Sequence, residues 1–164
     1  MSRLDSAIRR LQAQRACIDH AACAVAELPG PVLELGLGNG RTYDHLRSRL
    51  RDREIFVFER EVAAHPDCVP PPSRLILGDF AETLPRALDR FAGAVCLAHA
   101  DIGSGDPAAS RRSAELVARH VPPLLRPGGL LLCELALEVP ALERLPMPEG
   151  VAPERYFYYR KPSA

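Results

Sequence analysis

Five short, largely apolar runs alternate with longer segments of helical or polar sequence, and this alternation limits the folds open to the chain. The runs lie at residues 32–35, 55–58, 75–77, 94–98 and 130–135. Apolar side chains on successive residues fit strands that are covered on both faces, because a sheet with one solvated face shows alternating polar and apolar residues instead. The sequence therefore predicts an α/β fold with a doubly wound, mostly parallel sheet.

Helical spacing and breaker residues predict the positions of the helices. In residues 4–28 apolar residues recur at mostly helical intervals, and Pro29 and Gly30 mark the end of this segment. Four prolines between residues 65 and 72 predict an extended connection, and the aromatic tail at residues 155–161 favours a strand at the sheet edge. The remaining helices are expected at residues 41–50, near Val62, at residues 84–91 and at residues 107–121.

The length and charge of the chain narrow its organisation and partners. A chain of 164 residues fits one domain of the commonest size. We divide it into an N-terminal helical segment (residues 1–28), expected to fold over the site as a lid, a core (residues 31–135) and a C-terminal edge-strand region (residues 136–164). The 21 basic residues balance 21 acidic ones, so the formal net charge is zero, which argues against a nucleic acid partner.

Location and redox state follow from features that the sequence lacks. No apolar run approaches the roughly 20 residues that cross a bilayer, and the first residues lack the apolar core of a secretory signal. We therefore expect no membrane partner and a cytoplasmic location. The five cysteines form no C-x-x-C pair, so they are expected to be reduced thiols rather than zinc ligands or a disulfide framework.

Three glycines at alternate positions follow the first apolar run. Glu34 lies near the end of the run, and Gly36, Gly38 and Gly40 then lead into a helical segment. Glycine permits a tight turn and lets a ligand approach the main chain more closely than a Cβ would allow. A dinucleotide loop has the spacing G-x-G-x-x-G, but the position three residues after Gly38 is Arg41. This spacing argues against a bound pyrophosphate.

Acidic and aromatic residues follow the second and third runs. Glu59 comes directly after the second run, and its two acceptor oxygens suit the vicinal hydroxyls of a ribose. Gly78, Asp79 and Phe80 follow the third run, where the aromatic ring can lie against a flat base. Both groups are expected at the carboxyl edge of the sheet, where ligands bind in folds of this class.

The fourth run is followed by His99, Asp101 and a glycine-containing loop at residues 102–105. Four successive strand ends thus carry polar residues or glycine. Because the carboxyl ends of parallel strands share one edge, together they outline an elongated pocket for a nucleoside with a small polar tail.

These motifs resemble those of the class I S-adenosylmethionine-dependent methyltransferases. The matching features are E-x-G-x-G-x-G at residues 34–40, Glu59, the Gly78–Asp79 pair and L-R-P-G-G at residues 125–129. The resemblance covers about residues 31–135, and the opening at residues 40–44 is similar to a group of small bacterial methyltransferases. It implies a Rossmann-like methyltransferase fold, S-adenosyl-L-methionine as the cofactor and methyl transfer to an unidentified, small-molecule acceptor.

The resemblance also implies roles for single residues. It places Gly36, Gly38 and Gly40 against the methionine part of the cofactor, Glu59 on the ribose and Asp79 on the adenine amino group. The neighbours of Asp79, Gly78 and Phe80, belong to the same cofactor site.

Three further residues of the opening are also expected in the cofactor site, each with an open alternative. Glu34 either orients the glycine loop or meets the methionine ammonium. Arg41 either pairs with the methionine carboxylate or faces solvent. Tyr43 either covers the donor or only starts the helix.

Methyl transfer requires alignment of the acceptor, exclusion of water, and a base where the acceptor arrives protonated. We expect His99 or Asp101 to be this base, since an imidazole titrates near neutral pH; a core histidine bonded to the backbone is the competing interpretation. Metal-dependent relatives carry acids after both the fourth and fifth strands, and the fifth run offers only Glu134, so no metal is expected.

Two other functions remain open from the sequence. A non-catalytic S-adenosylmethionine-binding module would keep the pocket but seal the methyl group from any acceptor. A NAD-dependent oxidoreductase would need the second half of the dinucleotide fold, which the chain lacks. Self-association as a homo-oligomer through the tyrosine-rich tail is also left open.

Overall fold

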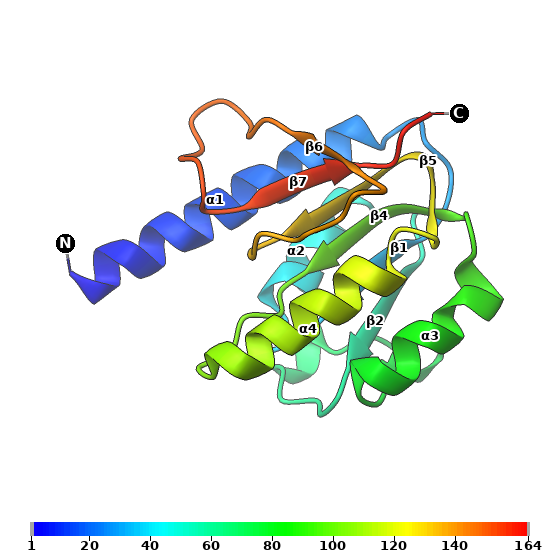
Figure 1. The fold of residues 1–164 in the computed structure, drawn as a ribbon. Coiled ribbons are helices and arrows are strands. Elements are labelled where there is room, and N and C mark those ends of the chain that lie inside the picture. Colours follow the sequence, from blue (N-terminus) through cyan, green and yellow to red (C-terminus); the bar gives the residue numbers. More distant parts are fainter. Residues whose placement is uncertain (1, 164) are drawn as a thin grey trace.

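The computed structural model describes residues 2–163 and consists of strands that alternate with helices along most of the chain (Figure 1). The strands are β1 (Val32–Leu35), β2 (Ile55–Glu59), β3 (Leu75–Leu77), β4 (Val95–Ala100), β5 (Leu125–Cys133), β6 (Glu143–Leu145) and β7 (Phe157–Arg160). The α-helices are α1 (Arg3–Ala24), α2 (Arg41–Arg49), α3 (Phe80–Phe91) and α4 (Pro107–His120), and two 3₁₀ turns are η1 (Pro66–Cys68) and η2 (Pro72–Arg74).

All the strands join one seven-stranded sheet in the order β3-β2-β1-β4-β5-β7-β6. Neighbours from β3 to β5 run parallel, and β7 runs antiparallel to both β5 and β6. The chain order reverses between β1 and β4, which is the position where ligands bind in open α/β sheets. This is the doubly wound, mostly parallel α/β sheet that the sequence predicts, with an N-terminal helix added.

Helices cover both faces of the sheet. One buried cluster joins β1 and β2 to α3 and α4 through Leu33, Phe58, Leu84 and Val117. The side chains on the opposite face belong to a second cluster that includes residues of α1 and α2. In β1 successive residues are therefore buried on alternate faces, and this explains why its run shows no polar and apolar alternation.

Most of the predicted strands and helices are found, with shifted ends. β4 continues to Ala100, so His99 lies inside a strand rather than after it. β5 begins at Leu125 rather than at residue 130, and its register against β4 shifts between Val95 and Leu97. α3 begins at Phe80 because the Asp79 carboxylate accepts a hydrogen bond from the Ala81 amide and caps the helix.

The prediction of a helix near Val62 is wrong. Residues 60–65 form bends and loop, and the prolines that follow support only the turns η1 and η2. Too few residues separate β2 from Pro66 for a stable helix to form there. The connection at residues 65–72 therefore contains short 3₁₀ turns in addition to extended chain.

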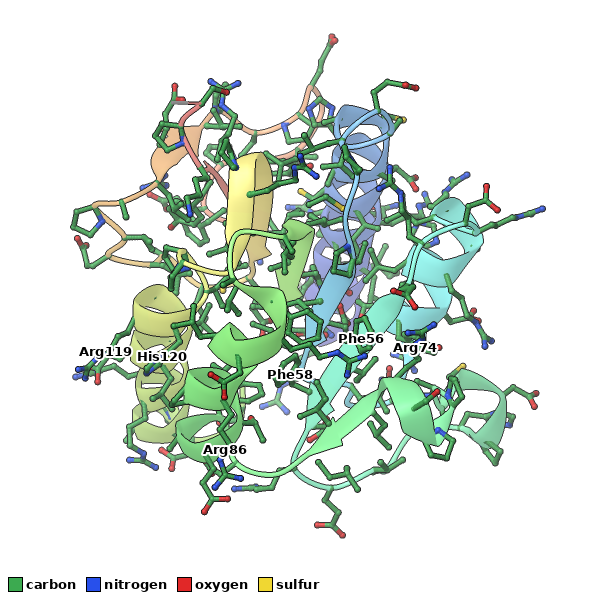
Figure 2. The ribbon with its side chains drawn as sticks, turned by 90° about the vertical axis from the view of Figure 1, so that its right-hand side faces the viewer. Phe56, Phe58, Arg74, Arg86, Arg119 and His120 are labelled. Carbon is green, nitrogen blue, oxygen red and sulfur yellow. The ribbon has the colours of Figure 1, made fainter. Side chains whose placement is uncertain are left out.

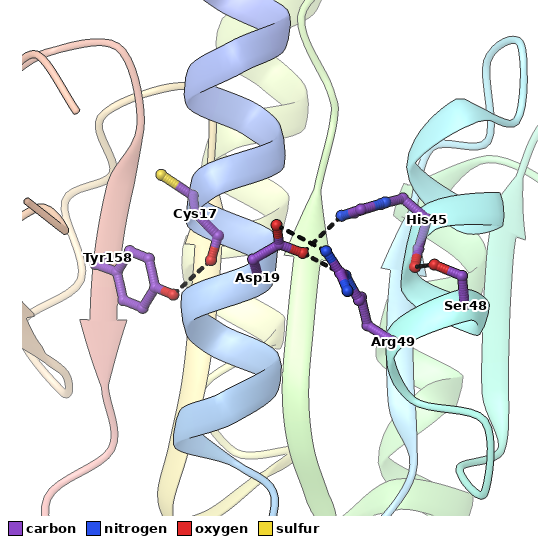
Figure 3. Close-up of polar contacts among 6 residues, drawn as sticks. All are labelled: Cys17, Asp19, His45, Ser48, Arg49 and Tyr158. Carbon is purple, nitrogen blue, oxygen red and sulfur yellow. Dashed lines mark hydrogen bonds and ion pairs between the residues drawn. The ribbon is translucent and has the colours of Figure 1, made fainter. Parts of the chain in front are cut away.

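Side chains from two other elements fix α1 against the sheet domain (Figure 3). Asp19 accepts hydrogen bonds from His45 Nε2 at 2.8 Å and from Arg49 Nε at 2.6 Å, which join α1 to α2. On its other side, the Tyr158 hydroxyl of β7 donates to the Cys17 carbonyl at 2.7 Å. The C-terminal half of α1 is thus held by both a helix and a strand.

The aromatic core near β2 is shielded by a basic side chain. Phe56 is buried, and the Arg74 guanidinium carbon lies 4.9 Å from the centre of its ring (Figure 2). Such contacts cover an aromatic ring while the charge stays hydrated.

Among residues 2–163, no helix combines the length and the apolar character that a membrane crossing requires.

Candidate functional site

A cavity of about 440 Å³ lies at the carboxyl edge of the sheet. The ends of β1, β2, β3 and β4 meet there because these strands are parallel neighbours. The residues that line this cavity include seven predicted from the sequence: Gly36, Gly38, Glu59, Gly78, Asp79, Phe80 and Asp101. Four strand ends therefore do contribute to one site, as the motif spacing predicts.

The glycines after β1 are required for different local reasons. Gly36 has φ +90°, and a Cβ there would collide with the Asp101 carbonyl oxygen. Gly38 has φ +50° and open space where its Cβ would be, and it lines the cavity. Gly40 also has a positive φ, but a Cβ there would meet Cys68 and Ala64, outside the cavity. Gly36 and Gly38 thus shape the cavity wall, whereas Gly40 allows close packing behind it.

Glu59 holds the glycine loop in place. Its Oε2 accepts hydrogen bonds from the amides of Leu37 at 2.7 Å and Gly38 at 3.1 Å, and its Oε1 accepts one from the Arg60 amide at 2.7 Å. The Glu61 amide lies 3.4 Å from the same Oε1, so backbone amides supply four donors to the roughly four acceptor positions of this carboxylate. Glu59 combines loop support with a position on the cavity wall.

Gly78, Asp79 and Phe80 form the wall at the end of β3. Asp79 is exposed, and one of its oxygens caps α3 by accepting from the Ala81 amide at 2.8 Å. Phe80 is half-buried and packs against the core beneath the cavity. Gly78 has φ +141°, a conformation that residues with a Cβ rarely adopt.

Two acids meet at the ends of β4 and β5. Ala100 and Cys133 are paired in the sheet, and Asp101 and Glu134 are the next residue of each strand. Burial and the Asp101 charge raise the pKa of Glu134 to about 7. Glu134 Oε1 also accepts a hydrogen bond from the Gly103 amide, in the loop that lines the cavity. Glu134 lies within the fifth apolar run (residues 130–135), and the sequence did not predict it as a site residue.

His99 does not lie at the cavity, in contrast to its predicted role as a base. The side chain is fully buried, with Nδ1 2.6 Å from Glu34 Oε2 and Nε2 2.8 Å from the Tyr156 hydroxyl. Burial alone would lower the pKa of His99, but the Glu34 carboxylate raises it overall. Both ring nitrogens are engaged inside the protein, so the imidazole is placed as a structural group.

Glu34 is likewise buried away from the cavity. In addition to His99 it accepts a hydrogen bond from the Thr42 hydroxyl at the start of α2. This contact ties β1 to the helix that follows the glycine loop. Of the two roles considered from the sequence, the geometry fits loop orientation and not contact with a methionine ammonium.

Arg41 and Tyr43 also lie outside the cavity. Arg41 is exposed beside a small groove between α1 and α2. Tyr43 is buried, and the Arg47 guanidinium carbon lies 5.5 Å from its ring centre. Their alternatives, a solvent-facing arginine and a tyrosine that packs at the helix start, match these positions.

The loop at residues 102–105 was predicted as part of the pocket, and its Ile102, Gly103 and Ser104 line the cavity. The remaining lining residues were not predicted, because nothing in their pattern distinguishes them from an ordinary helix or strand end. They are Arg60 after β2, Ala81 of α3, and Ala109, Arg112, Ser113 and Leu116 of α4. Within residues 2–163 no group of three or more His, Cys, Asp or Glu side chains is arranged to hold a metal ion.

Comparison with known proteins identifies the family. A family model described as S-adenosyl-L-methionine methyltransferase matches residues 1–161. The chain belongs to this methyltransferase family. A search among proteins of curated function finds no match for the methyltransferase.

Solved structures agree with this family. A crystal structure of an S-adenosyl-L-methionine methyl transferase from Silicibacter pomeroyi DSS-3 has 49% sequence identity and a TM-score of 0.93, covering 98% of this chain and 99% of that chain. Human methyltransferase-like protein 13, solved with S-adenosylhomocysteine, has 14% identity and a TM-score of 0.58, covering 95% of this chain and 82% of that chain. The second likeness is one of fold.

S-adenosylmethionine is the cofactor of the methyltransferase, and the cavity has the features that this molecule needs. The main chain at Gly38 is bare, since no Cβ occupies the open space beside it. Carboxylates at Glu59 and Asp79 present acceptor oxygens on neighbouring walls, where hydroxyl and amino groups of a nucleoside can donate.

Proposed function

We propose that the chain transfers a methyl group from S-adenosylmethionine to a small-molecule acceptor that enters the cavity beside β4. The volume of about 440 Å³ supports this proposal. It falls in the lower part of the range of small-molecule sites, and the cofactor itself takes up much of it. The remaining space suits a compact acceptor group.

The residues on the cavity wall suggest how the cofactor is held. Asp79 and Phe80 would bind the adenine, by accepting from its amino group and by lying against its ring. Glu59 would accept from the ribose hydroxyls, and Gly36 and Gly38 would leave room for the amino-acid part. These roles follow the order of the strand ends β3, β2 and β1 along the cavity.

When bound, S-adenosylmethionine supplies a methyl group on a positively charged sulfur that keeps the electron pair of the broken bond. The protein would align the acceptor with the methyl group, exclude water from the cavity and supply a proton acceptor. Asp101 is the candidate base, because it lines the cavity and Gln14 Nε2 holds its Oδ2 at 3.2 Å. His99 is not part of this proposal, since it lies buried behind the site.

Binding calorimetry with S-adenosylhomocysteine tests the cofactor site. The variant Gly38→Ala should weaken binding about tenfold, because its Cβ would enter the open space in the cavity. Gly93→Ala is the matched control: Gly93 has a similar φ of +62°, also has nothing within 4 Å of a built Cβ, and lies away from the cavity. Equal affinities of the two variants, or no binding by the unmodified protein, would contradict the proposed site.

A further inference from the structure

Asp101 and Glu134 are neighbours across the sheet at the edge that carries the cavity. They directly follow the paired residues Ala100 and Cys133 of the parallel strands β4 and β5. The Glu134 amide also approaches the Ala100 carbonyl at 3.4 Å. Neighbouring positions of parallel strands place the two side chains on the same face, and the Asp101 side chain is a hydrogen-bond partner of Glu134, so the two carboxyl groups can share a proton.

The loop after β4 is shaped around the Glu134 carboxyl group. The Gly103 amide donates to Glu134 Oε1. A Cβ at Gly103 would lie only 2.6 Å from this oxygen and 2.9 Å from the carboxyl carbon. Since Gly103 itself lines the cavity, the absence of its side chain brings the Glu134 carboxyl group up to the cavity wall.

One oxygen of each acid accepts a hydrogen bond from an amide group outside the pair. Gln14 Nε2 lies 3.2 Å from Asp101 Oδ2 and 3.0 Å from the Tyr156 hydroxyl. An amide nitrogen only donates, so Asp101 Oδ2 acts as an acceptor. Since the Gly103 amide makes Glu134 Oε1 an acceptor in the same way, both acids are held alike and the shared proton belongs to the pair.

We propose that Glu134 is a positioning residue for methyl transfer, which shares one proton with Asp101 and so sets the charge at the acceptor end of the cavity. This inference rests on the proposed function, in which Asp101 is the base. It adds a residue that acts through Asp101 and need not itself touch the acceptor.

The surroundings of the pair support a change of charge near neutral pH. Burial and the Asp101 charge raise the pKa of Glu134 to about 7, while the Gly103 amide and the more distant Arg10 of α1 act in the opposite direction. The other ionisable groups that face the pair are the buried hydroxyl of Tyr156 and the His99–Glu34 pair behind it. The pair therefore passes from one negative charge to two as the pH rises through about 7.

The proton balance of the reaction follows from this arrangement. An acceptor X–H gives its proton to an Asp101 oxygen, and the electron pair of that bond stays on X for the new bond to carbon. The two acids together gain one proton and lose one negative charge. When Glu134 is ionised as well, its negative charge makes Asp101 a stronger proton acceptor. Proton transfer from the acceptor is then favoured at neutral or slightly alkaline pH.

A pair of ligands that differ in charge at sulfur tests this inference without an acceptor. S-adenosylmethionine carries a positive sulfur and S-adenosylhomocysteine does not. We expect the preference for S-adenosylmethionine, measured as the ratio of the two dissociation constants by calorimetry, to rise about five- to tenfold between pH 6 and pH 8. In Glu134→Gln the ratio should stay constant, because the amide keeps the shape of the side chain but does not ionise.

Two further variants complete the experiment. Gly103→Ala keeps every charge but displaces the Glu134 carboxyl group, so the rise of the ratio between pH 6 and pH 8 should be smaller. This variant also tests the inference if Glu134→Gln fails to fold. Glu138→Gln removes an exposed acid of the same loop and should behave as the unmodified protein. A constant ratio in the unmodified protein, or an undiminished rise in Glu134→Gln, overturns this inference alone. Failure of both ligands to bind overturns the proposed function with it.

Discussion

At the scale of single residues, the environment of each acid at the sheet edge decides what it can do. Glu34 is fully buried, bonded to Thr42 and His99, and does not line the cavity. Glu59 supports the glycine loop through backbone amides and still faces the cavity. Glu134 is half-buried beside another acid, which favours its protonated form. One residue type thus supplies a structural anchor, a loop support and a proton carrier.

Replacement of His99 by leucine tests the buried pair. His99→Leu leaves the Glu34 carboxylate in the core without its ionic partner, and loss of one partner from a buried pair costs about 3–5 kcal/mol. The free energy of unfolding from urea titration should fall by that amount. The exposed His65 is the control, since His65→Leu should change this energy by less than about 0.5 kcal/mol.

The pH dependence of the same variant has a defined sign. The folded pKa of His99 is raised, so its ion pair contributes fully below the unfolded value of about 6.5 and the contribution is lost as the pH rises through the folded pKa. The difference between the unmodified protein and His99→Leu should therefore be larger at pH 6 than at pH 9. A difference that grows toward high pH would show that the pair does not carry the charge assigned to it.

At the scale of elements, α1 depends on side chains from the rest of the fold for its position. Its first turn has a capping box between Ser2 and Asp5, which stabilises the helix locally. Leu4 and Ile8 of its N-terminal half are exposed, so packing there is weak. Farther along, Gln14 contacts Asp101 and Asp19 contacts α2. These contacts connect the position of α1 to the candidate base.

Removal of the Asp19 carboxylate should loosen α1. Asp19→Ala loses the bonds to His45 and Arg49, and partly exposed ion pairs contribute up to about 1 kcal/mol. Hydrogen–deuterium exchange of the α1 amides should accelerate, while exchange in β4 should not change. Asp44→Ala is the control, since Asp44 pairs with Arg47 of its own helix.

The stabilisation that Asp19 provides through His45 and Arg49 depends on pH. Burial by itself would raise the pKa of Asp19, but the hydrogen bonds from Arg49 and His45 lower it overall. A carboxyl group with a lowered folded pKa stabilises the fold above its unfolded pKa and loses that contribution as the pH falls through the folded one. The difference between Asp19→Ala and the unmodified protein should therefore disappear at strongly acid pH. Equal exchange of α1 in both proteins at neutral pH would mean that Tyr158 and the apolar contacts hold the helix alone.

The sequence predicts the elements better than it predicts the direction of side chains. Apolar runs located β1 and β3 to the residue, although only β1 is buried along its whole length and Leu77 of the edge strand β3 is 58% exposed. The end of β4 was placed too early, and this error made His99 a strand-end residue when it faces Glu34 inside the sheet. A continuous apolar run does not reveal which face each side chain takes, because both faces are buried.

At the scale of the whole molecule, the topology explains why a site could be predicted at all. Parallel strands bring their carboxyl ends to one edge, so residues far apart in sequence, such as Gly38 and Asp101, meet there without any pattern that links them. The loop at residues 102–105 follows the same rule, since it continues from the end of β4. The wall contributed by α4 lies beyond it, because residues such as Arg112 reach the cavity through the packing of α4 on the sheet, which spacing alone does not give.

The stability of the whole fold should report on cofactor binding. A ligand that binds only the folded state, at a free concentration 100 times its dissociation constant, stabilises by about 2.7 kcal/mol. For a chain of this size that corresponds to a rise of about 5–10 °C in the melting temperature. S-adenosylhomocysteine should produce this shift in a thermal scan, and NADH should not, because the glycine spacing after β1 does not suit a pyrophosphate. Gly38→Ala should show a smaller shift than Gly93→Ala at equal ligand concentration, since only the first places a Cβ in the cavity. A shift with NADH and none with S-adenosylhomocysteine would mean that the ends of β1 to β4 hold a different nucleotide.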